Sequence, residues 1–177
     1  MGSAATESTR LETGSNLVQK TERLAHVIAQ KDVILLTGAT TGIVYVVGKT
    51  AHDAGCFHIG ISPAINEREH ADLYKLPGDA CDSLIYTGFG LKGRNVVLVR
   101  SCDVVLFVAG AMGSLNEFTI AHDEGKIIGC LTGTGGVADE SEYLLEKFGK
   151  RTSTAQVFQS DDPERLVDDC LKALGRQ

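Results

Sequence analysis

The 177-residue sequence has no segment that is apolar for long enough to cross a membrane, and its 17 Lys and Arg residues are scattered rather than clustered. With 23 Asp and Glu residues, the formal net charge is -6. We therefore expect neither a nucleic-acid-binding face nor a polybasic membrane patch. A small anionic ligand is still compatible with this charge, because backbone N–H groups at helix starts bind anions without net positive charge.

The five cysteines form no CxxC pair, and their number is odd, so the sequence does not predict a disulfide framework. Three of them lie in or beside apolar runs, which indicates buried, reduced thiols. The five histidines are dispersed, so no His/Cys cluster predicts a metal site. Residues 1–16 are polar and lack the apolar core of a signal peptide. We expect a flexible arm there, and a cytoplasmic protein.

Short apolar runs alternate with helical patterns along the rest of the chain. The runs DVILLTG (32–38) and DVVLFVAG (103–110) end in glycine and are typical of buried strands. The β-branched run within residues 93–102 leaves helical and mixed structure open, and residues 63–78 are expected to be a loop. The pattern predicts one Rossmann-like α/β domain over residues 17–177, with a doubly wound parallel sheet and helices on both faces, in three layers. Further helices are expected over residues 17–30, 41–54, 114–124, 140–148 and 163–174, and further strands at CFHIGIS, SLIYTG, KIIGCLTG and AQVFQ.

The first glycine-rich turn, TGATTG, follows a predicted strand and opens a predicted helix. Gly38 and Gly42 would let the backbone turn tightly and approach a ligand, although a simple tight turn is the alternative. Thr40 and Thr41 add hydroxyls where free N–H groups favour an anion. The nearby GKT is not a P-loop, because Gly42 lies six positions before Gly48 where that motif needs five. Lys49 is then expected to be a solvated helix charge.

The second turn, AGAMGSLNE, allows two interpretations of Glu117. Ser114 and Glu117 have the spacing of a capping box, in which the glutamate turns back onto the helix start. Alternatively, the carboxylate turns into a ligand cleft. Arg94 lies 16 positions before Gly110 (110 − 94), at the beginning of a helix if residues 93–102 are helical. This cation and the carboxylate would then converge near the two turns, and a plain loop charge is the alternative for Arg94.

AGAMGSLNE resembles the PGGxGTxxE motif of the LOG phosphoribohydrolases, Rossmann-like enzymes that release a base from nucleoside 5′-monophosphates. TGATTGIVYVVGKTAHDAGCFHIGISP resembles that family's first glycine turn and its GxxIGIxP stretch, and Arg94 stands at the family's spacing for its catalytic arginine. GRNVVLVRSCDVVLFVAG is more similar to a sister branch that includes molybdenum-cofactor carrier proteins. That branch is described as binding rather than cleaving. The resemblance covers about residues 17–174.

The resemblance implies a catalytic pair and a phosphate site. Glu117 would stabilise the ribose or activate water, and Arg94 would position or polarise the leaving base. The 5′-phosphate would be held by two sets of residues. The bound ligand would be a nucleoside monophosphate or the molybdenum cofactor. No metal and no further cofactor would be required. The resemblance also implies a homodimer. The phosphate-binding residues would be Gly38, Thr40, Thr41, Gly42, Gly110, Ala111, Met112, Gly113 and Ser114.

Several positions depart from the family pattern. Ala109, Ala111 and Ser114 replace the motif's proline, second glycine and threonine, and Asn95 replaces the lysine that follows the arginine. An alanine at 111 would crowd the phosphate or force the backbone away from positive φ. The residues before Leu17 do not resemble the family's opening strand. Two functions therefore stay open, a phosphoribohydrolase and a non-catalytic carrier or nucleotide sensor, with a structural subunit that keeps a relict pocket as a third.

Overall fold

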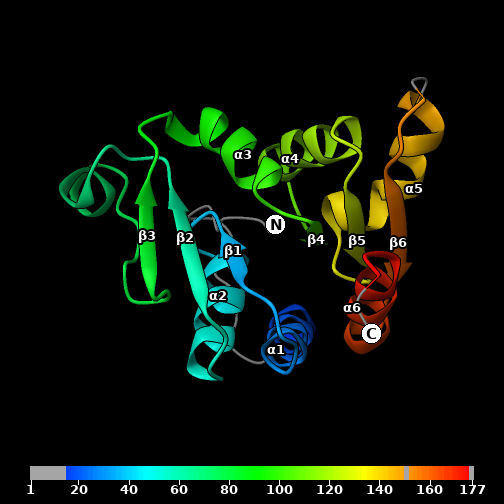
Figure 1. Cartoon of the computed structure of the whole chain (residues 1–177), viewed down its shortest axis with the longest axis horizontal. Coiled ribbons are helices and arrows are strands. Elements are labelled where there is room, and N and C mark those ends of the chain that lie inside the picture. The colour runs from blue at the N-terminus through cyan, green and yellow to red at the C-terminus, as the bar shows by residue number, and fades with distance from the viewer. Residues whose placement is uncertain (1–14, 150–151, 176–177) are drawn as a thin grey trace. The chain divides into compact units, whose positions relative to one another are not determined.

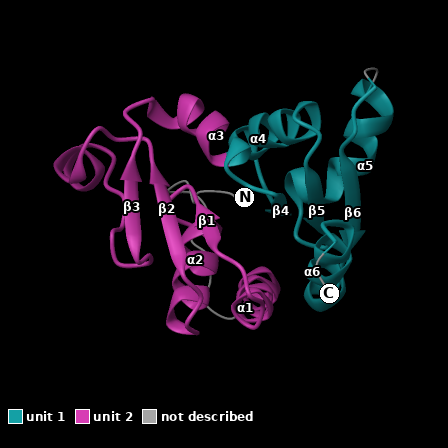
Figure 2. Cartoon of the chain, viewed as in Figure 1, with its two compact units in different colours: residues 1–3, 99–177 teal, residues 4–98 magenta. Residues whose placement is uncertain are grey.

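The computed structural model describes residues 15–149 and 152–175, whose helices and strands are drawn in Figure 1. The arm expected over residues 1–16 therefore lies almost entirely outside the described residues. The chain divides into two compact units with a boundary between Leu98 and Val99 (Figure 2). Unit 2 holds the described residues up to Leu98, and unit 1 holds those from Val99 onward.

Unit 2 is built on a parallel sheet in the order β1-β2-β3. Its helix α2 packs on this sheet and against helix α1. The approach of α2 to the sheet is close, because a Cβ added at Gly48 would lie 2.5 Å from the Cε1 atom of the His58 ring. The elements are α1 (Asn16–Ala29), β1 (Leu35–Thr37), α2 (Ile43–Asp53), β2 (His58–Ser62) and β3 (Ser83–Tyr86).

The connection between β2 and β3 contains a π-helical turn, η1 (Glu69–Leu73), where the sequence predicted only a loop. The buried ring of His70 fixes this segment to the sheet. Its Nε2 donates to the carbonyl oxygen of Pro77 at 3.0 Å, so its Nδ1 accepts from the hydroxyl of Ser62 at 2.8 Å in the neutral ring. Tertiary hydrogen bonding to a histidine thus orders a segment whose local composition indicates none.

Helix α3 (Gly90–Arg100) begins three residues before the predicted segment 93–102. Gly90 has φ 64°, and its N–H donates to the carbonyl oxygen of Pro63 at 3.1 Å, which fixes the entry into the helix. Arg94 therefore lies in the second turn of α3 rather than at its beginning. The β-branched run did not prevent a regular helix, because Leu98 and Val99 are fully buried within it.

Unit 1 is a three-layer arrangement around a parallel sheet in the order β4-β5-β6. On β5, Ile128 and Cys130 belong to a core shared with α4 and α5, while a Cβ added at Gly129 would meet Cys170 and Leu166 of α6. Because side chains alternate across a strand, α4 and α5 cover one face and α6 covers the other. The elements are β4 (Val104–Val108), α4 (Met112–Asp123), β5 (Ile127–Leu131), α5 (Gly136–Phe148), β6 (Gln156–Ser160) and α6 (Pro163–Ala173).

The fold class is that predicted from the sequence: a Rossmann-like α/β protein with parallel strands and covering helices. The last helix also begins as expected. Asp162 caps α6 by accepting a hydrogen bond from the N–H of Arg165 at 2.9 Å, and Pro163 takes the first helical position. No helix among residues 15–149 and 152–175 is long and apolar enough to span a membrane.

Candidate functional site

The first turn joins β1 to α2 in unit 2. Gly42, with φ 74°, is the N-cap of α2 and has no side chain that could cap the helix. No side-chain cap bond is therefore made to the first N–H groups of this helix, which face the turn. Gly38 and Thr40 are buried, whereas Thr41 is exposed. The structure thus gathers the predicted residues 38–42 into one turn at a helix start, where an anion is favoured.

Arg94 lies directly over this turn. A Cβ added at Gly38 would be 2.0 Å from Nη1 and 2.7 Å from Cζ of its guanidinium group. The φ of Gly38 lies outside the left-handed region, so this glycine makes room for the arginine rather than allowing a special backbone conformation. Arg94 is only 5% exposed, and its neighbour Asn95 is 3% exposed. A loop charge is therefore the wrong interpretation of Arg94, because the guanidinium belongs to the first turn.

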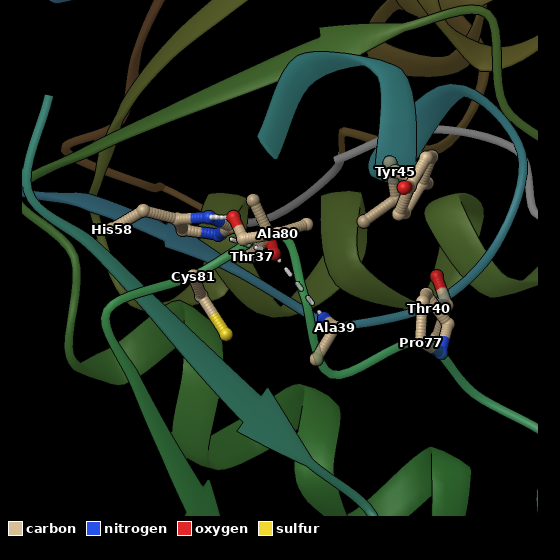
Figure 3. A pocket seen from close by; sticks show the side chains of 9 residues that line it. Thr37, Ala39, Thr40, Tyr45, His58, Pro77, Ala80 and Cys81 are labelled. Carbon is tan, nitrogen blue, oxygen red and sulfur yellow. Dashed lines mark hydrogen bonds between the residues drawn. The ribbon is translucent and has the colours of Figure 1, made fainter. Parts of the chain in front are cut away.

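A buried hydrogen-bond relay, which the sequence did not predict, supports the same turn (Figure 3). The ring of His58 donates from Nδ1 to the carbonyl oxygen of Ala80, and its Nε2 accepts from the hydroxyl of Thr37 at 2.8 Å. The Thr37 hydroxyl accepts in turn from the N–H of Ala39 at 3.2 Å. Burial lowers the pKa of His58, which keeps the ring neutral and able to accept this bond.

A small pocket opens beside the relay, between the first turn, the start of α2 and the β2–β3 connection. Its volume is about 220 Å³, including space open to solvent. Burial raises the pKa of the Cys81 thiol, so no thiolate nucleophile is offered here. The exposed surface of the pocket walls is mostly apolar. The lining residues are Thr37, Ala39, Thr40, Val44, Tyr45, His58, Pro77, Ala80 and Cys81.

The second turn joins β4 to α4 in unit 1, and α4 begins two residues earlier than predicted. Its N-cap is Ala111, which makes no side-chain cap, so Ser114 lies inside the first turn of the helix. The capping-box interpretation of Ser114 and Glu117 is therefore wrong. Ser114 is 2% exposed and Glu117 is 5% exposed, so this helix buries a carboxylate in its second turn.

Backbone conformation and available space restrict the residue type at Gly110 but not at Ala111. Gly110 has φ 113°, and a Cβ there would lie 2.7 Å from the Cβ of Ser114, so only glycine fits. Ala111 has an extended backbone with φ -113° and ψ -153°, which alanine adopts freely. The backbone of Ala111 thus lies away from positive φ, as in the second of the two expectations for this position. Together with Met112 and Gly113, Ala111 forms the exposed lip of the turn.

A third glycine-rich loop, residues 132–136 (TGTGG), packs against the second turn within unit 1. The N–H groups of Val137 and Ala138 donate to the carbonyl oxygens of Gly110 and Ala109, each at 3.0 Å. This loop was not predicted from the sequence, although it repeats the signal of the other two, a buried strand followed by glycines and then a helix. Asp139 caps it, accepting from the N–H of Gly135 at 2.9 Å.

The N-cap positions of α2, α4 and α5 make no side-chain cap bond, in contrast to those of α1 and α6. The side chains of Ser15 and Asp162 cap α1 and α6, and Asp139 serves the start of α5. Arg94 and Glu117 belong to different units, so the convergence of this pair stays a prediction.

The remaining candidates for chemistry have structural roles. Burial raises the pKa of Cys130 to about 11 and that of Cys170 to about 12, so neither thiol is a nucleophile at neutral pH. Lys49 pairs with Asp53 one turn along α2, as expected for a helix charge. Across the described part of the chain, no three His, Cys, Asp or Glu side chains are grouped as metal ligands.

The parallel strands, the covering helices and the glycine turns at helix starts define a Rossmann-like α/β protein. The model of the SLOG cluster4 family matches residues 1–167, and the chain belongs to this family. An uncharacterized protein of Archaeoglobus fulgidus is 31% identical over 109 residues, covering 62% of this chain. The chain matches 66% of that relative's length.

Several solved structures share the whole fold. TM1055, a structural genomics target, superposes with a TM-score of 0.81 at 23% identity, over 97% of this chain and 96% of its own. The molybdenum cofactor binding protein of Rippkaea orientalis gives 0.75 at 25% identity, over 98% and 94%. The molybdenum cofactor carrier protein of Chlamydomonas reinhardtii gives 0.74 at 25% identity, over 99% and 96%.

Proposed function

We propose that the protein binds a small phosphorylated ligand through a glycine turn at a helix start, and that this ligand is the molybdenum cofactor, bound as cargo. The observation that carries the proposal is the pair of helix starts without side-chain caps, at α2 and α4. Two neighbours that cover almost the whole chain at 25% identity bind or carry that cofactor. Its pterin bears a phosphate, the group that uncapped helix starts attract.

The residues of the second turn suit a phosphate. Gly110 leaves no side chain over the turn, and the space that a Cβ would fill there borders the hydroxyl oxygen of Ser114 at 2.9 Å. The N–H groups of residues 110–114 would face the ligand, and those of residues 38–42 would contribute from the first turn. At the first turn, the guanidinium of Arg94 beside Gly38 would supply a positive charge for such a group.

The first experiment is retention of the cofactor during gel filtration. The purified protein is mixed with molybdenum cofactor released from a molybdoenzyme, and molybdenum is measured in the protein peak. We expect stoichiometric retention by the wild type and its loss in Arg94→Gln. Arg100→Gln is the matched control, because Arg100 is 64% exposed on the same helix and pairs only at the surface, with Glu124. Absence of molybdenum from the wild-type peak would contradict the cofactor proposal.

A second function, hydrolysis of nucleoside 5′-monophosphates, is favoured by one observation: Glu117 is buried and is not a helix cap. In that reaction water adds to the anomeric carbon and the N-glycosidic bond breaks, releasing a protonated base and ribose 5-phosphate. Glu117 would stabilise the oxocarbenium-like transition state or take the proton of water, and Arg94 would polarise the leaving base.

Chromatography of free base tests this second function with a panel of nucleoside 5′-monophosphates. If the protein is a hydrolase, Glu117→Gln lowers the rate by about 10²–10⁴-fold. Glu124→Gln is the matched control, because it makes the same substitution at an exposed glutamate, the one that pairs with Arg100. Release by the wild type would make the protein an enzyme, whereas cofactor retention without any release would make it a carrier.

We further propose a homodimer located in the cytoplasm. Unit 2 exposes Ile65 and Phe89 by 66% and 67%, and the Cβ position of Gly88 lies 2.9 Å from the Ile65 side chain. These neighbouring apolar side chains support contact with a second copy. Light scattering on wild type and Phe89→Ser tests the dimer, with Phe148→Ser as a control for an equally exposed phenylalanine in unit 1. The five free cysteines support a reducing compartment.

A further inference from the structure

The residue that opens the second turn has an unusual backbone conformation. Ala109 has φ 51°, in the left-handed region that a residue with a Cβ adopts only when its surroundings hold it there. Ala39 in the first turn has φ 50°. Both alanines follow the end of a strand at a turn proposed to bind ligand. A left-handed alanine in each of these turns calls for a group that holds it in place.

A threonine hydroxyl holds each of these alanines. The N–H of Ala109 donates to Oγ1 of Thr134 at 2.8 Å, and the N–H of Ala39 donates to Oγ1 of Thr37 at 3.2 Å. Thr134 lies 25 residues further along the chain, in the glycine loop after β5. Its own hydroxyl donates to the carbonyl oxygen of Leu131 at 2.5 Å, which fixes the rotamer and aims a lone pair at Ala109.

The loop that carries Thr134 is itself held in place and is not proposed as a further anion site. Asp139 accepts from the N–H groups of Thr134 and Gly135, at 3.4 Å and 2.9 Å, so a carboxylate already occupies this helix start. The N–H of Val137 donates to the carbonyl oxygen of Gly110. A Cβ at Gly136 would lie 2.1 Å from that same oxygen, so the two loops touch backbone to backbone.

We propose that Thr134 is a positioning residue for the ligand turn. Its hydroxyl keeps Ala109 left-handed, and this conformation sets the direction in which the N–H groups of residues 110–113 point. Thr134 does not touch the ligand. This inference rests on the proposed function only for the identity of what the turn binds, because the contact between Thr134 and Ala109 exists without any ligand.

The variant that tests the proposal is Thr134→Val, which removes the hydroxyl and keeps the shape. We expect about a tenfold loss of affinity for the released molybdenum cofactor, the cost of one misdirected hydrogen bond. Thr134→Ser keeps the hydroxyl and should restore the affinity to within about threefold of the wild type. Equal losses in the valine and serine variants would overturn the proposal.

Ser153→Ala is the matched control for a merely structural effect. Its hydroxyl makes the same pair of bonds elsewhere in unit 1, accepting from the N–H of Ala155 at 3.0 Å and donating to the carbonyl oxygen of His122. We expect Ser153→Ala to lower the melting temperature without changing affinity. If Thr134→Val and Ser153→Ala lose affinity in the same proportion to their loss of melting temperature, Thr134 acts only through stability.

Hydrogen exchange separates this inference from the proposed function. At conditions where the protein stays folded, the amides of Ala109 and Gly110 should exchange at least about tenfold faster in Thr134→Val, and at the wild-type rate in Ser153→Ala. Unchanged exchange in Thr134→Val overturns the positioning role. If these amides exchange faster in Thr134→Val but the wild type retains no cofactor, the positioning role is supported and the proposed function is overturned.

Discussion

Replacing Gly38 by alanine should disable the first turn by displacing Arg94. The added Cβ would lie 2.0 Å from Nη1 of the guanidinium, whereas ordinary contact begins at about 3.4 Å. The group must therefore move by about 1.4 Å (3.4 − 2.0). A displacement of this size in a group that orients a ligand can cost about a hundredfold in activity or affinity.

The variant should lose some stability but stay folded. The φ of Gly38 is accessible to alanine, so the substitution gains about 0.4–1 kcal/mol by restricting the unfolded chain. Displacing a guanidinium that is only 5% exposed costs about 1–3 kcal/mol. We therefore expect the free energy of unfolding to fall by no more than about 2–3 kcal/mol. The loss of binding or activity should be larger than this loss of stability explains, because function depends on where the guanidinium points.

The assay is a double-mutant cycle that combines Gly38→Ala with Arg94→Gln, read by cofactor retention or base release. If the alanine acts through the arginine, it should have no further effect once Arg94 is replaced. Gly78→Ala is the matched control in the same unit, because its Cβ would meet only Leu84, at 3.8 Å. Wild-type function in Gly38→Ala, or an undiminished loss in the Arg94→Gln background, would refute the reasoning.

Three further predictions concern stability, measured by urea denaturation. Gly136→Ala should cost about 2–4 kcal/mol, because its Cβ meets a backbone oxygen at φ 58°, whereas Gly175→Ala, with open space at φ 79° just after α6, should cost only about 1 kcal/mol. Asp162→Ala should cost about 1 kcal/mol through the lost cap of α6, and Asp162→Asn should recover most of it. Because burial lowers the pKa of His58 from its ordinary 6.5, the unfolded chain takes up its proton first. Stability should then be complete above about pH 6.5 and fall by up to about 1.4 kcal/mol per pH unit below it, with a smaller slope in His58→Gln.

Each stability prediction has an outcome that would contradict it. Equal costs for the two glycine variants would mean that the contact between the loops in unit 1 is not tight. A neutral Asp162→Ala would mean that the α6 cap contributes nothing measurable. A pH slope that is the same in His58→Gln would show that the titrating group is not His58.

The order of strands and helices was predictable because hydrophobic periodicity and glycine punctuation are local properties. Buried strands such as Val104–Val108 are continuous apolar runs, and Asp162 with Pro163 marks the start of α6. The two glycine turns were located for the same reason. Element boundaries were less certain, and α3 and α4 each begin two or three residues earlier than predicted.

The roles of individual residues were decided by tertiary structure. The sequence left Glu117 between a cap and a ligand group, and the start of α4 at Met112 excludes the capping box. It predicted that Gly38 allows a tight turn and a close approach to a ligand, whereas in the fold the missing side chain of Gly38 makes room for Arg94.

The supports of the two turns were also invisible in the sequence. His58 stands 21 residues from Thr37, and Thr134 stands 25 residues from Ala109. A local pattern determines whether a segment forms a strand, a turn or a helix, because those choices depend on neighbouring residues. Which buried hydroxyl or ring meets which backbone group depends on packing between distant segments, and that arrangement exists only in the folded chain.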